Sequence, residues 1–152
     1  MLNLRNAEPL LEVRKLVLGE KIAEERGKVI GMSVKSIGPE GVHMEETFAT
    51  EVKGLGRAPS GRNIGTMDLI EVPGGFFSGT GQGYLVTQDG DSVVWKCYSM
   101  GKSEAGKYKS VNIIQFMTTS QKLSWMNGYI AVDEGMSDPK TMELSSTGYE
   151  WK

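Results

Sequence analysis

Hydrophobic and polar residues alternate along most of the chain, and glycine-rich turns separate the alternating stretches at short intervals. A period of two places successive side chains on opposite faces of a strand, whereas a helix repeats its apolar positions every three to four residues. From residue 19 onward the pattern therefore predicts antiparallel strands joined by turns. We expect about eight strands, over residues 21–37, 42–52, 64–72, 76–88, 92–100, 108–119, 129–133 and 142–151.

Turn residues mark two hairpins and one loop. Gly-Pro-Glu-Gly at residues 38–41 favours a tight turn between the first two expected strands. Asp89 and Gly90 tolerate the positive φ of a type I′ turn, so the stretches on either side of them should pair. Glycine and proline interrupt residues 54–61 too often for a strand interior, which predicts a loop.

Two segments depart from the alternation. Residues 6–18 space their apolar side chains nearly as a helix does, so they could form a short N-terminal helix or begin a strand. Residues 120–127 have the composition of a capped helical turn. We expect this turn to plug one end of the barrel with Leu123 and with Trp125 or Met126.

The chain is expected to form a single all-β domain. Its 152 residues suit one core, and 20 glycines against 5 prolines favour many turns and closely packed strands. Eight antiparallel strands leave no unpaired edge if they close into a barrel, which is the expected fold. An open sandwich is the alternative. Residues 19–152 would form the barrel, after an N-terminal segment at 1–18.

Charge and composition exclude several functional classes. The 17 basic and 19 acidic residues nearly balance, which argues against binding to nucleic acid or to an anionic membrane. We find neither a membrane-spanning apolar stretch nor the pattern of a signal peptide, so we expect a cytoplasmic protein. Cys97 is the only cysteine and His43 the only histidine, so we expect no metal site and no cofactor.

Residues 79–90, Gly-Thr-Gly-Gln-Gly-Tyr-Leu-Val-Thr-Gln-Asp-Gly, followed by Trp95 and Gly101, resemble an uncharacterised prokaryotic family of small barrel proteins. Further signatures of that family are similar to residues 118–123, 126–128 and 150–152, so the resemblance spans roughly residues 28–152. It implies a calycin-like barrel, similar in fold to allene oxide cyclase and dirigent barrels. It implies no activity and no catalytic residue, because the family has no established substrate.

Three glycines two residues apart, Gly79, Gly81 and Gly83, would leave one face of a strand bare. An aromatic side chain or a neighbouring strand could fill that space, or a ligand could occupy it. The candidate ligand-binding residues are therefore these glycines together with Trp95 and Phe48, whose rings could contact a ligand or pack in the core.

Charged residues supply two further candidate sites. Arg57 and Arg62 lie on either side of Pro59-Ser60-Gly61 in the loop region and could bind an anion, although arginines in such loops are commonly solvated. Glu46 shares an apolar strand face with Met44 and Phe48, where burial would raise the pKa of its carboxyl group. Asp68, between apolar neighbours, raises the same possibility, and both carboxyl groups are candidate acid or base catalysts unless basic residues pair with them.

Three functions are compatible with these features. The first is a non-catalytic barrel that binds a small, largely apolar ligand in its interior. The second is an isomerase or cyclase that acts on a hydrophobic substrate through Glu46 or Asp68. The third is a structural protein with a filled barrel that assembles into a homo-oligomer. The sequence does not decide whether the protein is an enzyme.

Overall fold

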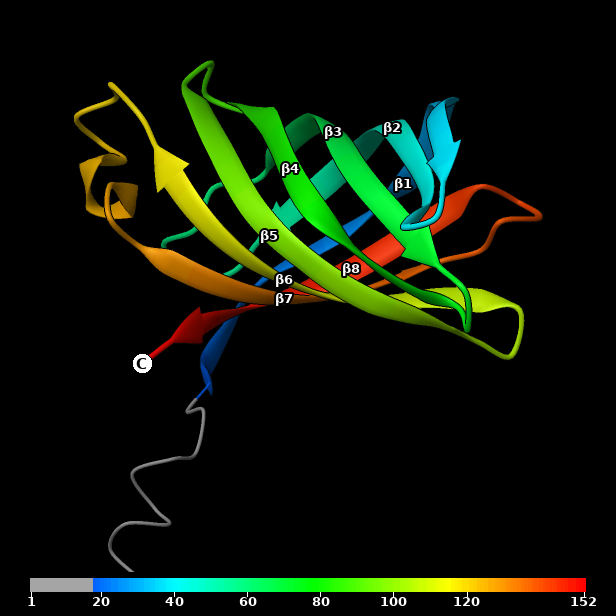
Figure 1. Cartoon of the computed structure of the whole chain (residues 1–152). Coiled ribbons are helices and arrows are strands. Elements are labelled where there is room, and N and C mark those ends of the chain that lie inside the picture. The colour runs from blue at the N-terminus through cyan, green and yellow to red at the C-terminus, as the bar shows by residue number, and fades with distance from the viewer. Residues whose placement is uncertain (1–17) are drawn as a thin grey trace, which may run out of the picture.

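Eight antiparallel strands form one sheet that closes on itself in the computed structural model, which describes residues 18–152 (Figure 1). Strands adjacent in sequence pair with each other, and β8 pairs with β1 to complete the barrel. The strands are β1 (Leu18–Gly38), β2 (Gly41–Gly54), β3 (Gly61–Val72), β4 (Phe76–Thr87), β5 (Ser92–Glu104), β6 (Lys107–Met117), β7 (Ile130–Ser137) and β8 (Glu143–Trp151).

The predicted all-β closed barrel is confirmed, and the alternative of an open sandwich is wrong. Each predicted strand corresponds to an observed one, although β7 continues to Ser137, beyond the predicted end at residue 133. The N-terminal segment predicted as a helix or a strand start lies outside the described residues, except for Leu18, which begins β1.

Side chains alternate between the interior and the outer face, as the sequence pattern predicts. On β5, for example, Val93, Trp95, Cys97 and Ser99 are buried while the residues between them are exposed. Closure of the sheet brings these inward side chains into one shared interior.

The turn between β4 and β5 differs in type from the prediction. A type I′ turn needs positive φ at both central residues. Within this turn only Gly90 has positive φ, at 87°, and its amide donates to the carbonyl of Thr87 at 3.0 Å. The predicted hairpin is correct. However, Asp89 does not adopt positive φ, so the turn is not type I′, and Gly90 is the residue that follows the tight turn with positive φ.

A short 3-10 helix, η2 (Ser124–Met126), closes one end of the barrel, near the C-terminus (Figure 1). Leu123 and Met126 are only 4% and 5% exposed, and they pack against the inward-facing Leu85 and Val93. The predicted plug is confirmed, with Leu123 and Met126 as its buried residues.

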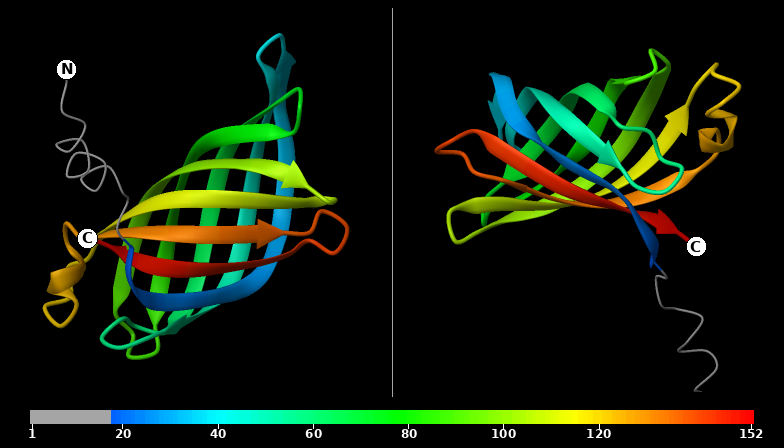
Figure 2. Two further views of the ribbon diagram at one scale, coloured as in Figure 1. Left: turned by 90° about the horizontal axis from the view of Figure 1, so that it is seen from below. Right: turned by 180° about the vertical axis from the view of Figure 1, so that it is seen from behind.

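The opposite end carries the turns of four hairpins, and the β1–β2 hairpin projects beyond the barrel there (Figure 2). Pairing of β1 with β8 ends at Lys28, whereas pairing with β2 continues to Gly38. The hairpin therefore extends past the closed part of the sheet. Among residues 18–152, no helix covers this second end, and we call it the open end of the barrel.

Candidate functional site

The barrel encloses a cavity of about 230 Å³ to which every strand contributes side chains. The helix η2 and its packed neighbours close one end of the barrel, and the lining extends to Tyr108 and Ser137, close to the turns at the other end. Most of the wall is apolar, and its large side chains include Phe48, Met67, Leu69, Phe77, Trp95 and Phe116.

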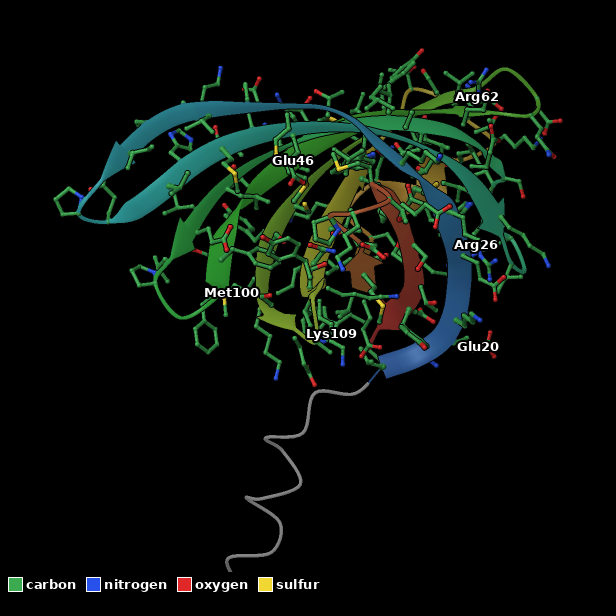
Figure 3. The ribbon with its side chains drawn as sticks, turned by 90° about the vertical axis from the view of Figure 1, so that its right-hand side faces the viewer. Glu20, Arg26, Glu46, Arg62, Met100 and Lys109 are labelled. Atoms are coloured by element: carbon green, nitrogen blue, oxygen red, sulfur yellow. The ribbon has the colours of Figure 1, made fainter. Side chains whose placement is uncertain are left out.

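Four carboxyl groups also face this cavity: Glu25, Glu46, Glu71 and Asp133. Among residues 18–152, no lysine, arginine or histidine lines it. In Figure 3, Glu46 lies on β2 at one side of the barrel, while Met100 and Lys109 lie on strands at the opposite side. The side chains that line the cavity are therefore mostly apolar, with four carboxyl groups among them and no basic side chain from residues 18–152 to balance their charge.

A hydrogen-bond network holds the half-buried Glu25 on the barrel wall. Its carboxylate accepts hydrogen bonds from Thr50, from the amide of Asn63 at 2.8 Å and from Ser146 at 3.3 Å. Trp95 Nε1 in turn donates to Asn63 Oδ1 at 2.8 Å. Because three donors satisfy it, Glu25 is fixed in place and is a structural element of the wall.

Asp133 forms a second polar group on the wall, directly across from Asn112 in the β6–β7 register. Asn112 Nδ2 donates to Asp133 Oδ1 at 2.8 Å. Burial raises the pKa of Asp133 to about 6, because the charged form loses its hydration. Asn112 Oδ1 is buried and has no hydrogen-bond partner among the described residues, so an acceptor faces this region unused.

Glu46 and Glu71 form a third group toward the open end, together with Tyr108. The Tyr108 hydroxyl donates to the Glu71 carboxylate at 3.4 Å, and its ring packs edge-on against Phe77 at 5.6 Å between centroids. Burial, and after it the charge of Glu71, raises the pKa of Glu46. Burial and Glu71 likewise raise the pKa of Tyr108. These three groups therefore share one electrostatic environment.

The glycine-rich face of β4 points inward as predicted, but protein atoms fill it. A Cβ atom at Gly83 would lie 2.2 Å from the Trp95 ring, and one at Gly81 would lie 2.3 Å from Met67 Sδ. At Gly79 the obstacle is the backbone carbonyl of Asp68. Of the candidate ligand-binding residues, Trp95 and Phe48 line the cavity, whereas the three glycines allow the wall to pack and do not line it.

Asp68 lies on the outer face of β3, away from the cavity. Its carboxylate pairs with His43 Nε2 at 2.5 Å, and its side chain is 53% exposed. The structure therefore separates the two candidate acid or base residues, and only Glu46 faces the interior. Basic residues do not neutralise Glu46, because no ion pair reaches it from residues 18–152.

The two candidate anion-binding arginines have separate partners. The Arg57 guanidinium lies 4.0 Å from the centroid of the Trp125 ring. Arg62 pairs with Glu51 at 3.2 Å on the exposed outer face. Each side chain contacts a different neighbour, and the structure does not bring the two together as a binding fork.

Three of the four interior acids were not predicted from the sequence: Glu25, Glu71 and Asp133. Glu25 follows another glutamate, and the residues two positions away from Asp133 are Ala131 and Gly135. Such small or charged neighbours do not mark a face as buried. Within the described part of the chain, no cluster of three His, Cys, Asp or Glu side chains is arranged to hold a metal ion, and no helix has the length and apolarity needed to cross a membrane.

The fold and cavity define a small closed eight-stranded barrel with an accessible, partly acidic interior. Neither a protein-family model nor a curated protein matches the sequence. Solved structures do resemble the fold. A protein of unknown function from Clostridium acetobutylicum superposes with a TM-score of 0.77 at 15% identity, covering 91% of this chain and 99% of its own.

Two further structures extend the comparison. A beta-barrel-like protein from Acinetobacter baumannii gives a TM-score of 0.76 at 18% identity, covering 91% of this chain and 97% of its own. An enzyme from Penicillium herquei gives 0.62 at 15% identity, covering 90% and 98%. At these identities the similarity establishes the shared barrel fold only. The chemistry of the interior has to be inferred from the residues of this chain.

Proposed function

We propose that this protein binds a small, largely apolar molecule in the interior of its barrel. The observation that carries the proposal is the cavity of about 230 Å³, whose wall is mainly aromatic and aliphatic. Apolar pockets with a few inward polar groups are the usual form of small-molecule sites, and barrels hold such sites in their mouths. The stacked pair Phe48 and Trp95, with ring centroids 6.0 Å apart, offers a flat apolar surface.

Native mass spectrometry of the freshly purified protein tests this proposal. We expect extra mass on the folded protein that disappears from the denatured chain. Ser99→Leu would place a larger apolar side chain at a buried position of the cavity wall, and it should reduce the bound fraction. Thr80→Leu, on the exposed outer face of β4, is the matched control and should retain the ligand. The same spectrum counts subunits and so tests the expected homo-oligomer.

Glu46 supports a second candidate, an isomerase or cyclase acting on the bound molecule. Its carboxyl group faces the cavity and has a raised pKa, as a proton-transferring residue requires. Incubating the co-purified molecule with the protein in heavy water should then place deuterium on a carbon of that molecule. Glu46→Gln should abolish the exchange while the molecule still binds. Exchange that persists in this variant would rule out Glu46 as the acid or base.

A further inference from the structure

The charges that face the cavity are all of one sign. Four carboxyl groups line it, and no basic side chain does so among the described residues. Charged groups inside proteins are normally paired or fully hydrogen-bonded, because an unpaired charge loses its hydration without compensation. No basic side chain among residues 18–152 therefore compensates these carboxyl groups.

Glu25 and Asp133 have close hydrogen-bond donors, whereas Glu46 and Glu71 do not. Glu25 accepts from three side chains, and Asp133 accepts from Asn112. Glu71 receives only the long hydrogen bonds from Tyr108 at 3.4 and 3.5 Å. Glu46 receives no hydrogen bond from residues 18–152. Among the four carboxyl groups, unused acceptor capacity is thus concentrated at Glu46 and Glu71.

The wall between these two carboxyl groups is apolar. Met44 and Leu69 lie directly opposite each other in the β2–β3 register, one step from Glu46 and Glu71 along the inward-facing positions. Phe48 is the next inward residue of β2 beyond Glu46, toward the closed end. The carboxyl groups could therefore bind a positive head group, and the adjacent apolar wall could contact a hydrocarbon tail.

We propose that the cavity selects amphipathic amines, with the ammonium group between Glu46 and Glu71 and the hydrocarbon directed inward past Phe48. This inference rests on the proposed function and specifies its ligand. An ammonium group supplies both charge and donors to two carboxylates. An alcohol supplies a single donor and leaves the charges unbalanced. A carboxylate or phosphate ligand would meet like charge and no basic partner.

Isothermal titration with octylamine, octanol and octanoate tests the inference, because these probes share one hydrocarbon chain and differ in head group. At pH 7.5 we expect octylamine to bind about tenfold more tightly than octanol, as one moderately strong charge-assisted contact would give. Octanoate should bind weakest. Glu46→Gln and Glu71→Gln should each weaken octylamine binding about fivefold or more and leave octanol binding unchanged.

Glu45→Gln is the matched control, since it removes the same charge from the outer face of β2, where Glu45 pairs with Lys35 at 3.6 Å. It should leave the affinity for octylamine unchanged. Equal binding of octylamine and octanol, with no effect of Glu46→Gln, would overturn the amine inference while the proposed ligand-binding function stands. Failure of all three probes to bind would overturn both, provided that circular dichroism shows an intact fold.

Discussion

The indole nitrogen of Trp95 donates to Asn63 Oδ1 at 2.8 Å, and this bond fixes which way the Asn63 amide points. With its oxygen engaged by Trp95, Asn63 can present only its NH₂ group to Glu25, which it does at 2.8 Å. One amide thus connects the aromatic wall of the cavity to the half-buried Glu25 carboxylate, and the two contacts require the amide's acceptor and its donor respectively.

Asn63→Asp tests the requirement for a donor at this position. The variant retains the acceptor for Trp95 but places a second carboxyl group beside Glu25. We expect the free energy of unfolding at pH 7 to fall by about 3 kcal/mol, the scale for leaving a buried charge uncompensated. Like charges raise the folded-state pKa of the pair, so the loss should shrink as the pH falls and one carboxyl group is protonated. Urea unfolding at pH 7 and pH 4.5 measures both effects.

Gln82→Glu makes the same amide-to-carboxylate change on the exposed outer face of β4 and is the control for Asn63→Asp. Its unfolding free energy should change by less than about 0.5 kcal/mol at either pH, as is usual for surface substitutions. An equal loss in both variants would show that the network around Glu25 is not responsible.

Gly83 of β4 leaves room for the Trp95 ring, and a substitution there tests whether the packing requires glycine. In Gly83→Ala the new methyl group would lie 2.2 Å from the Trp95 ring, so the indole or the strand must move. We expect a loss of about 1–3 kcal/mol in unfolding free energy, the usual cost of overpacking. At Gly31 of β1 the nearest atom to a new Cβ would be 3.9 Å away. Gly31→Ala is therefore the control, and thermal unfolding should find it close to the parent protein.

Strand periodicity explains which interior acids could be predicted from the sequence. In a strand, residues two positions apart share a face. The second neighbours of Glu46 are Met44 and Phe48, which mark its face as inward. Asp68 has apolar residues immediately beside it, at 67 and 69, and these point to the opposite face. The same periodicity thus directs Glu46 into the cavity and Asp68 to the outer surface.

The rest of the interior depends on information that is not local in sequence. Turn residues and alternation are local, so the eight strands and their order could be predicted. What fills the space over Gly81 and Gly83 depends on residues from β3 and β5, which only strand register brings together. Likewise, Glu25 meets Asn63 across 38 positions of sequence.

Arg57 should stabilise the closed end of the barrel through Trp125. Its guanidinium lies 4.0 Å from the ring centroid, and Trp125 also packs edge-on against Tyr129. We expect Arg57→Ala to lower the unfolding free energy by about 0.5–1 kcal/mol, the range for an exposed cation–π contact. Arg62→Ala removes an exposed ion pair with Glu51 and should have a smaller effect. Urea denaturation of the two variants side by side tests the difference.

Asp133 should make the barrel more stable in mild acid than at neutral pH. Burial raises its folded-state pKa from 3.8 to about 6. Between these values the folded protein binds a proton that the unfolded chain releases, so the free energy of unfolding falls as the pH rises from about 4 to about 6. Above pH 6 Asp133 is ionised in both states, and its burial then lowers the free energy of unfolding by about 3 kcal/mol, the value for a pKa shift of this size. The Asn112 amide and the nearby Ser146 hydroxyl lower the pKa of Asp133, and the nearby Glu25 and Glu134 carboxylates raise it, but burial is the largest effect.

Asp133→Asn isolates this contribution, because an amide stays neutral and can still accept the hydrogen bond from Asn112. Glu46 also has a raised pKa and adds a slope of the same sign, so the informative quantity is the difference between the variant and the parent protein at each pH. We expect that difference to favour the variant increasingly from pH 4.5 to pH 7.5 in urea unfolding. Glu40→Gln, in the exposed turn between β1 and β2, is the control and should leave the slope nearly unchanged. Parallel curves for Asp133→Asn and the parent protein would mean that Asp133 is already charged in the folded state at pH 4.5, and that its surroundings stabilise the carboxylate.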